Sequence, residues 1–210
     1  MRKILLAATI AALAVSHAAA QDVPAQQEAV IETSLGTITI ALDAQHAPQT
    51  VANFIRYANE KHFDGTVIYR VVPGFVLQMG SYDSDGKPRP THAGIPLEAN
   101  NGLSNVRGSV AMARGDDPAS ATAEFFISLA DNSASLNHEA SDAGNTSGYA
   151  VFGAVTNGMD VADKIAAVPL GGPGPFEGAA PLTPVTIESV QISAAPPTPP
   201  AASQLPPDTH

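Results

Sequence analysis

The sequence predicts a mainly β protein whose strands run antiparallel, and three observations support this prediction. In residues 29–43, apolar side chains alternate on both sides of a Ser-Leu-Gly turn, which is the pattern of a β-hairpin. Turn signals separate most of the later strand-like runs, and only two segments show helical spacing. These features favour an antiparallel barrel or sandwich over a parallel α/β fold, and periodicity leaves both of these open. The later strand-like runs are residues 66–72, 76–80, 108–114, 124–130, 149–156 and 184–192.

Two helices are expected between the strands. Pro48 suits the first turn of a helix, because its missing N–H is not needed there. Apolar residues then recur at i, i+3, i+4 and i+7, at Val51, Phe54, Ile55 and Ala58. A second, shorter helix is predicted over residues 160–167, ended by Pro169.

The N-terminus has the pattern of a secretory signal peptide. Arg2 and Lys3 precede an apolar run over residues 4–15, and the small residues 18–20 follow it. We expect cleavage after Ala20, export by the general secretion route and a periplasmic location, with release from the cell as the alternative. No later segment is long and apolar enough for a membrane anchor.

The rest of the chain is expected to hold one domain. Residues 21–27 form a short N-terminal extension, residues 28–192 the domain, and residues 193–210 a Pro-rich tail that we expect to be disordered. A role of this tail in partner binding is one candidate function.

Composition excludes several classes of function. The chain has 20 acidic and 10 basic residues, so its surface should repel nucleic acid and anionic lipid. It has no cysteine, which excludes disulfides and thiol chemistry. The histidines show no metal-ligand spacing, so we expect neither a metal nor a cofactor.

One arginine stands inside an apolar strand and is the first candidate for a functional residue. Arg70 lies among Val67, Ile68, Val71 and Val72. Leaving its charge unpaired in a core would cost several kcal/mol. Arg70 is therefore predicted to face a surface that a ligand can reach.

Residues 63–80, read FDGTVIYRVVPGFVLQMG, resemble the signature of the cyclophilins, which are peptidyl-prolyl cis-trans isomerases. Residues 108–114, 120–127 and 149–153 match further blocks of that family in the same order. The resemblance covers about residues 28–192, and the segment around residues 98–105 is similar to the bacterial periplasmic branch. It implies a closed eight-stranded antiparallel barrel, a helix over each open end, and ligands bound outside the filled barrel.

The resemblance also implies the residues of the site. Arg70 would be the catalytic residue, donating a hydrogen bond to the prolyl nitrogen or to nearby carbonyl groups. Gln78 would hold its guanidinium or bind the substrate backbone. The apolar proline pocket would consist of Phe75, Met112, Phe126 and Leu136, with Val76 at its edge. The remaining substrate-binding residues would be Ala113, Arg114, Glu124 and Tyr149.

The implied partners are proline-containing polypeptides, above all exported proteins that are still folding. A closed barrel has no open strand edge, so we expect a monomer.

Three residues depart from the common family pattern, and one of them, Tyr69 in place of histidine, is common among bacterial members. Glu124 stands where the family usually has glutamine, and Ser135 stands where an aromatic residue is frequent. We expect the Glu124 carboxylate to pair with Arg70 or Arg114 and to weaken catalysis. The last two departures leave an alternative function open: a proline-peptide-binding chaperone or scaffold with little isomerase activity.

Overall fold

The computed structural model describes residues 27–138 and 147–194. Eight strands form one antiparallel sheet in the order β10-β1-β2-β7-β5-β6-β4-β3. Their bounds are β1 Gln27–Thr33, β2 Gly36–Leu42, β3 Arg70–Val72, β4 Val76–Met79, β5 Ser109–Met112, β6 Phe125–Ser128, β7 Val151–Asn157 and β10 Ile187–Ala194. The predicted signal peptide, its cleavage site and nearly all of the Pro-rich tail lie outside the described residues.

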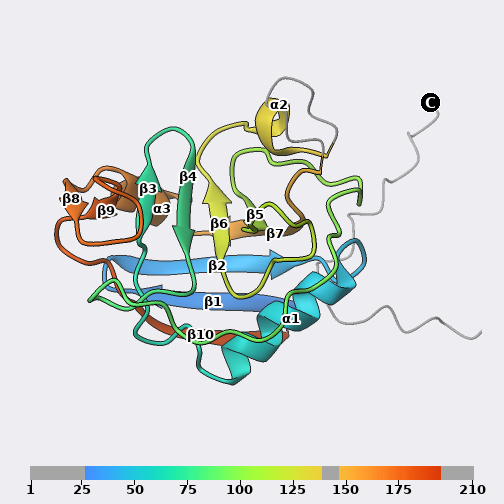
Figure 1. The fold of residues 1–210 in the computed structure, drawn as a ribbon, viewed down its shortest axis with the longest axis horizontal. Coiled ribbons are helices and arrows are strands. Elements are labelled where there is room, and N and C mark those ends of the chain that lie inside the picture. Colours follow the sequence, from blue (N-terminus) through green and yellow to red (C-terminus); the bar gives the residue numbers. More distant parts are fainter. Residues whose placement is uncertain (1–26, 139–146, 195–210) are drawn as a thin grey trace, which may run out of the picture.

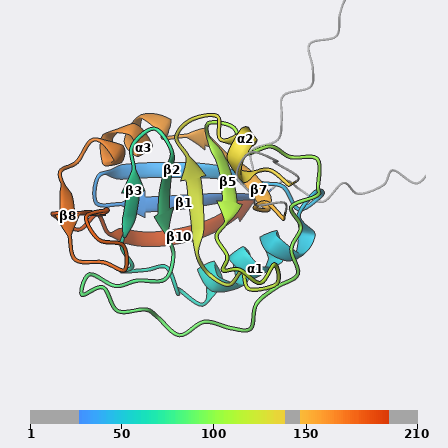
Figure 2. The ribbon, with the colours of Figure 1, turned by 45° about the horizontal axis from the view of Figure 1, so that its top comes forward.

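The sheet curls so that its two ends approach each other. Figures 1 and 2 show β3, β4, β5 and β6 lying across β1, β2 and β10. No ladder joins β3 to β10 within the described residues, but the segments just before these strands do pair. The Gly65 N–H donates to the Ile187 carbonyl at 2.7 Å, and the Ile68 N–H donates to the Val185 carbonyl at 2.9 Å. The predicted eight-stranded antiparallel barrel is thus confirmed, with closure by a short bridge in place of a full ladder.

A small hairpin explains why the closure is short. Strands β8 (Leu170–Gly172) and β9 (Ala180–Pro181) pair with each other beside β3. The Val71 N–H donates to the carbonyl of Ala179 at 2.8 Å, so the edge of β3 bonds to this hairpin where a closed barrel would present β10.

Two helices, α1 and α3, lie at opposite ends of the curled sheet (Figure 1). Helix α1 (Pro48–Asn59) begins at the predicted proline, and α3 (Met159–Ala166) lies within one residue of its predicted bounds. A third, four-residue helix, α2 (Ser133–Leu136), was not predicted. Within the described residues, no helix is both long and apolar enough to cross a bilayer.

The first turn of α1 takes its cap from a distant residue. The Glu98 carboxylate accepts hydrogen bonds from the backbone N–H groups of Gln49 and Thr50, at 3.1 and 2.8 Å. It also accepts one from the Thr50 hydroxyl at 2.7 Å. These N–H groups have no partner inside the helix, and a negative charge there also complements the helix dipole. Glu98 therefore ties α1 to the long segment before β5.

The interior of the curled sheet is filled with side chains. Phe54 of α1 lies 5.2–5.3 Å from the rings of Phe63, Phe125 and Phe152, measured between ring centroids. The first hairpin adds further buried side chains, those of Ile31, Ile38 and Ile40. A second, smaller cluster is separate from this core; we call it the outer cluster, and it consists of Val76, Ala111, Ala113, Phe126, Leu136 and Val151. A ligand can therefore bind only on the outside.

The cap formed by Glu98 is testable by mutation. We expect Glu98→Ala to lower the free energy of unfolding by about 1–2 kcal/mol, because two helix N–H groups lose their acceptor. Urea denaturation followed by circular dichroism measures this. Glu188→Ala, at an exposed position of β10, is the control and should change stability by less than about 0.5 kcal/mol. Equal effects of both substitutions would contradict the capping role.

Candidate active site

One row of side chains crosses four neighbouring strands and continues onto β7. Arg70 lies opposite Gln78, Gln78 opposite Phe126, Phe126 opposite Ala111, and Ala111 opposite Val151. Directly opposed residues of antiparallel strands place their side chains on the same face. Phe126, Ala111 and Val151 belong to the outer cluster, so the whole row, Arg70 included, lies on the outer face.

A cavity opens over this row. It has a volume of about 290 Å³. Its lining residues are Arg70, Phe75, Val76, Gln78, Ala113, Arg114, Phe126, Leu136, Tyr149 and Phe176. Phe126 and Tyr149 meet edge to face, with 5.5 Å between ring centroids, and form one apolar wall. The structure thus brings together nine of the eleven residues that the sequence suggested, and adds Phe176.

Arg70 is held at one side of the cavity. Its Nη1 donates to Oε1 of Gln78 at 3.1 Å, and its Cζ lies 5.2 Å from the centroid of the Phe176 ring. The Arg70 side chain is half-buried and Gln78 is 8% exposed. An arginine has five N–H donors, so the bond to Gln78 leaves most of its donor capacity for a ligand.

Hydrogen bonds to backbone carbonyls fix the apolar end of the cavity. The Phe75 carbonyl accepts from the Leu129 N–H at 2.7 Å and from the Asn132 side chain at 2.9 Å. The Leu136 carbonyl accepts from the Tyr149 N–H at 3.0 Å and from the side chain of Asn105 at 3.1 Å. The turn that carries Phe75 and the helix α2 that carries Leu136 are thereby set against the strands.

Arg114 lies at the opposite side from Arg70. Its Nε donates to the Gly148 carbonyl at 2.9 Å, and its Nη1 donates to the Gly115 carbonyl at 2.8 Å. Its Cζ lies 5.0 Å from the centroid of the Tyr149 ring. Arg114 and Tyr149 thus stabilise each other at the rim.

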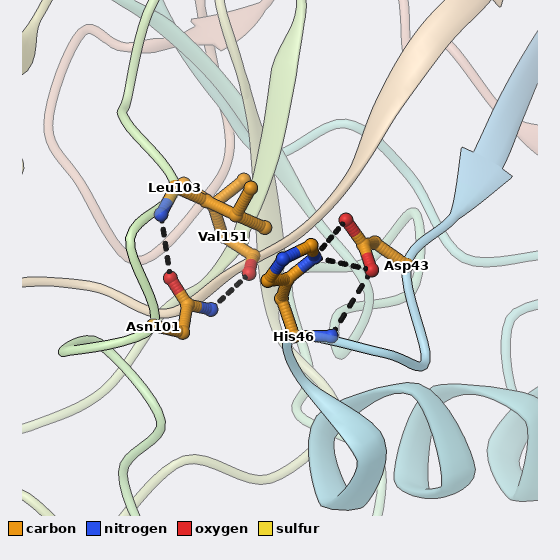
Figure 3. Close-up of polar contacts among 5 residues, drawn as sticks. All are labelled: Asp43, His46, Asn101, Leu103 and Val151. Carbon is orange, nitrogen blue, oxygen red and sulfur yellow. Dashed lines mark hydrogen bonds and ion pairs between the residues drawn. The ribbon is translucent and has the colours of Figure 1, made fainter.

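A further loop supports the outer cluster from the side. Figure 3 shows Asn101 donating to the Val151 carbonyl at 2.9 Å and accepting from the Leu103 N–H at 3.0 Å. Leu103 packs on the outer cluster.

Close by, Asp43 accepts a hydrogen bond from the His46 backbone N–H at 3.1 Å and contacts the Nδ1 atom of the His46 ring at 2.8 Å, which shapes the turn before α1. No group of three metal-ligating side chains occurs within residues 27–138 and 147–194.

The structure corrects the expectation for Met112. This side chain is 2% exposed and belongs to the interior core, where it lies opposite Phe125. Its neighbour Ala113 lines the cavity. Side chains alternate between faces along a strand, so Met112 faces the core and its assignment to the proline pocket was wrong.

The structure also corrects the expected contacts of Glu124. Its Oε2 accepts hydrogen bonds from the Tyr69 hydroxyl and from Nε2 of Gln78, the latter at 3.2 Å. The ion pairs found within the described residues do not include Glu124. Burial raises the pKa of the Tyr69 phenol, and the Glu124 charge raises it further, so Tyr69 remains a hydrogen-bond donor. Glu124 stands behind the cavity lining and does not itself line the cavity.

Phe176 is the lining residue that the sequence did not suggest. It lies in the loop between β8 and β9, is 43% exposed, and stacks on Tyr69 with 6.2 Å between ring centroids. Residues 171–178 are rich in glycine and proline and predict only a loop. The one sequence feature that could have indicated a role for Phe176 was a lone aromatic residue in such a loop.

Comparison with known proteins identifies the family. Residues 29–192 match the model of the cyclophilin type peptidyl-prolyl cis-trans isomerases. Peptidyl-prolyl cis-trans isomerase A of Dickeya dadantii is 42% identical over 193 residues, which are 91% of this chain and 98% of that protein. Peptidyl-prolyl cis-trans isomerase B of Escherichia coli is 43% identical over 161 residues, 77% of this chain and 96% of that protein.

Solved structures agree on the fold. A cyclophilin of Cryptosporidium parvum superposes with a TM-score of 0.64 at 18% identity, covering 81% of this chain and 99% of that one. A cyclophilin of Hirschia baltica gives a TM-score of 0.59 at 19% identity, with coverages of 85% and 81%. The chain belongs to the cyclophilin family, and at this identity to its bacterial members it is a peptidyl-prolyl cis-trans isomerase.

The hydrogen bonds of Asn105 predict that it stabilises the apolar end of the cavity. Asn105 is 1% exposed, and its side chain donates to the carbonyl of Leu136 and to Oδ1 of Asn137. We expect Asn105→Ala to lower the free energy of unfolding by about 2–3 kcal/mol, because it removes both bonds and opens a gap. Urea denaturation measures the loss, and methyl NMR of Leu136 should show a shifted signal. Asn101→Ala, at a half-exposed position with two bonds, is the control and should cost less; a larger loss there would contradict this assignment.

Proposed function

We propose that this isomerase acts at the outer-face cavity, with Arg70 as the catalytic residue, on X-Pro bonds of exported polypeptides that are still folding. The observation that supports the proposal most strongly is a cationic donor held beside an apolar cavity on the outside of a filled sheet. The reaction is a rotation, so the proposal requires no nucleophile, metal or cofactor.

The rotation barrier of an X-Pro bond sets the rate acceleration that the cavity must provide. An X-Pro bond meets a rotation barrier of roughly 18–20 kcal/mol and isomerises unaided in tens to hundreds of seconds. Reaching the millisecond range needs about 10⁴- to 10⁵-fold acceleration, or roughly 5.5–7 kcal/mol of transition-state stabilisation. Only interactions that are stronger with the twisted amide than with the planar one contribute.

The two sides of the cavity suit the two needs of this reaction. Phe75, Phe126 and Leu136 offer apolar surface to a proline ring and would hold it while the peptide bond turns. In the twisted amide, resonance is lost and the prolyl nitrogen becomes a better acceptor. Arg70 would donate to it or to a neighbouring carbonyl. A charged donor at a half-buried site acts more strongly than in water.

The flanking peptide backbone would bind beside the proline pocket. Arg114 follows β5, and its main chain would bind an extended peptide as a neighbouring strand would, with Ala113 lining the cavity beside it. Gln78 would hold Arg70, and Tyr149 would close the rim. The Cryptosporidium cyclophilin was also solved in the presence of the dipeptide Ala-Pro, which agrees with a proline-containing ligand for this fold.

Export to the periplasm is proposed from the N-terminal residues. Arg2 and Lys3, the apolar run and the small residues before Gln21 together support a cleavable signal peptide. The clients would then be polypeptides that fold after export, and the protein would act on them as a monomer.

The catalytic role of Arg70 is tested by substitution. We expect Arg70→Ala to lower kcat/KM for an Ala-Pro-Phe peptide by about a hundredfold, since a positioned donor to the reacting group is lost. The rate of cis-to-trans relaxation measures this. Arg56→Ala, at an exposed position of α1, is the matched control and should leave the rate unchanged. Full activity of the Arg70 variant would refute the proposed mechanism, and peptide binding without acceleration by the wild type would favour a binding module.

Phe176 is expected to assist Arg70 by covering its guanidinium. We expect Phe176→Ala to lower kcat/KM about twofold to fivefold, because a cation–π contact is worth about 0.5–1 kcal/mol at such a site. Phe176→Leu keeps apolar surface but has no π face, so it should recover little of this loss if the ring's electrostatics matter. Recovery to the wild-type rate would assign Phe176 a purely apolar role.

A further inference from the structure

A chain of hydrogen bonds runs behind the cavity to Arg70. The Tyr69 hydroxyl donates to Oε2 of Glu124, and Nε2 of Gln78 donates to the same oxygen. At its other end, Oε1 of Gln78 accepts from Nη1 of Arg70. Glu124 thus reaches Arg70 through one intervening side chain.

The direction of each bond follows from the chemistry of the groups. A glutamine side chain has a donor end and an acceptor end, and either end can face a given neighbour. An ionised carboxylate only accepts, and a guanidinium only donates. With Glu124 on one side and Arg70 on the other, Gln78 has one orientation that satisfies both neighbours. In that orientation its carbonyl oxygen points at Arg70.

The carboxylate is itself held in place. The Tyr69 ring is 1% exposed and packs against Tyr82, with 4.6 Å between ring centroids, and against Phe176. Gly80, directly after β4, lets the backbone of residues 123 and 124 approach closely. A Cβ atom there would lie 2.5 Å from the Ala123 carbonyl oxygen. A rigid hydroxyl and a close backbone therefore fix the position of Glu124.

We infer that Glu124 is a positioning residue for the isomerase reaction, which acts through Gln78 to aim the Arg70 guanidinium into the cavity, and that Tyr69 holds Glu124 for this task. The inference rests on the proposed role of Arg70. This inference reverses the expectation from the sequence that the Glu124 carboxylate would weaken catalysis. A direct ion pair would occupy the Arg70 donors, whereas the bond through Gln78 orients the guanidinium and uses one of its N–H groups.

Kinetics of three variants test the inference. We expect Glu124→Ala to lower kcat about fivefold to tenfold with little change in KM, because the loss affects the aim of Arg70 and leaves the proline pocket intact. Glu124→Gln keeps an acceptor oxygen and should stay within about threefold of the wild type. Tyr69→Phe should lower kcat by a smaller factor than Glu124→Ala. Glu188→Gln, far from the cavity on β10, is the charge-matched control.

NMR supplies a readout that a merely structural role would not move. In the wild type, the side-chain amide protons of Gln78 should show a hydrogen-bonded signal, assigned by its loss in Gln78→Ala. In Glu124→Ala this signal should shift toward that of a free amide, and the Arg70 side-chain signals should change with it. The melting temperature of each variant shows whether the protein remains folded.

The outcomes separate this inference from the proposed function. A folded Glu124→Ala protein with wild-type kcat, or with reduced kcat but unchanged Gln78 and Arg70 signals, would overturn the inference. So would a Glu124→Gln protein several times more active than the wild type, because the anion would then oppose catalysis. If Arg70→Ala is as active as the wild type, the proposed function of Arg70 fails first, and the Gln78 signals still report whether Glu124 sets its orientation.

Discussion

The interior of the curled sheet is filled with side chains, and this packing determines which residues can meet a ligand. Four phenylalanines pack against one another inside it, which leaves the outer face for a ligand: Phe54, Phe63, Phe125 and Phe152. The alternation of side chains along each strand then determines which residues a ligand can contact, because every second residue faces outward. Arg70 falls on the outer face for this reason, and so do the residues that the strands place beside it.

The Arg70 guanidinium on this face is held in place by its neighbours. Gln78 orients the guanidinium, Phe176 covers one side, and the apolar lining of the cavity lowers the competition from water. The cation–π contact alone is worth about 0.5–1 kcal/mol, and a hydrogen bond to a charged group about 1.5–3 kcal/mol. Together they hold a donor in place before the substrate arrives, which would make the stabilisation of a twisted amide that we propose for Arg70 effective.

The sequence predicted the features that depend on local patterns. Arg70 and Gln78 stand on two strands joined by a tight turn, so their pairing follows from a short stretch of chain. Features that depend on distant segments were not predictable in the same way. Phe176 reaches Arg70 from a loop far along the chain, and the partners of Glu124 depend on how β4 and β6 pair. Met112 was assigned to the wrong face because a shift of one residue reverses inside and outside.

We propose that an X-Pro peptide is bound and rotated on the outer face. NMR exchange spectroscopy of a proline peptide, with a small amount of isotope-labelled protein, tests both parts in one sample. We expect faster exchange between the cis and trans signals, together with shifts of the protein signals of Phe126, Leu136, Tyr149 and Phe176. Faster exchange with the shifts confined to another surface, or no faster exchange with a folded protein, would contradict it.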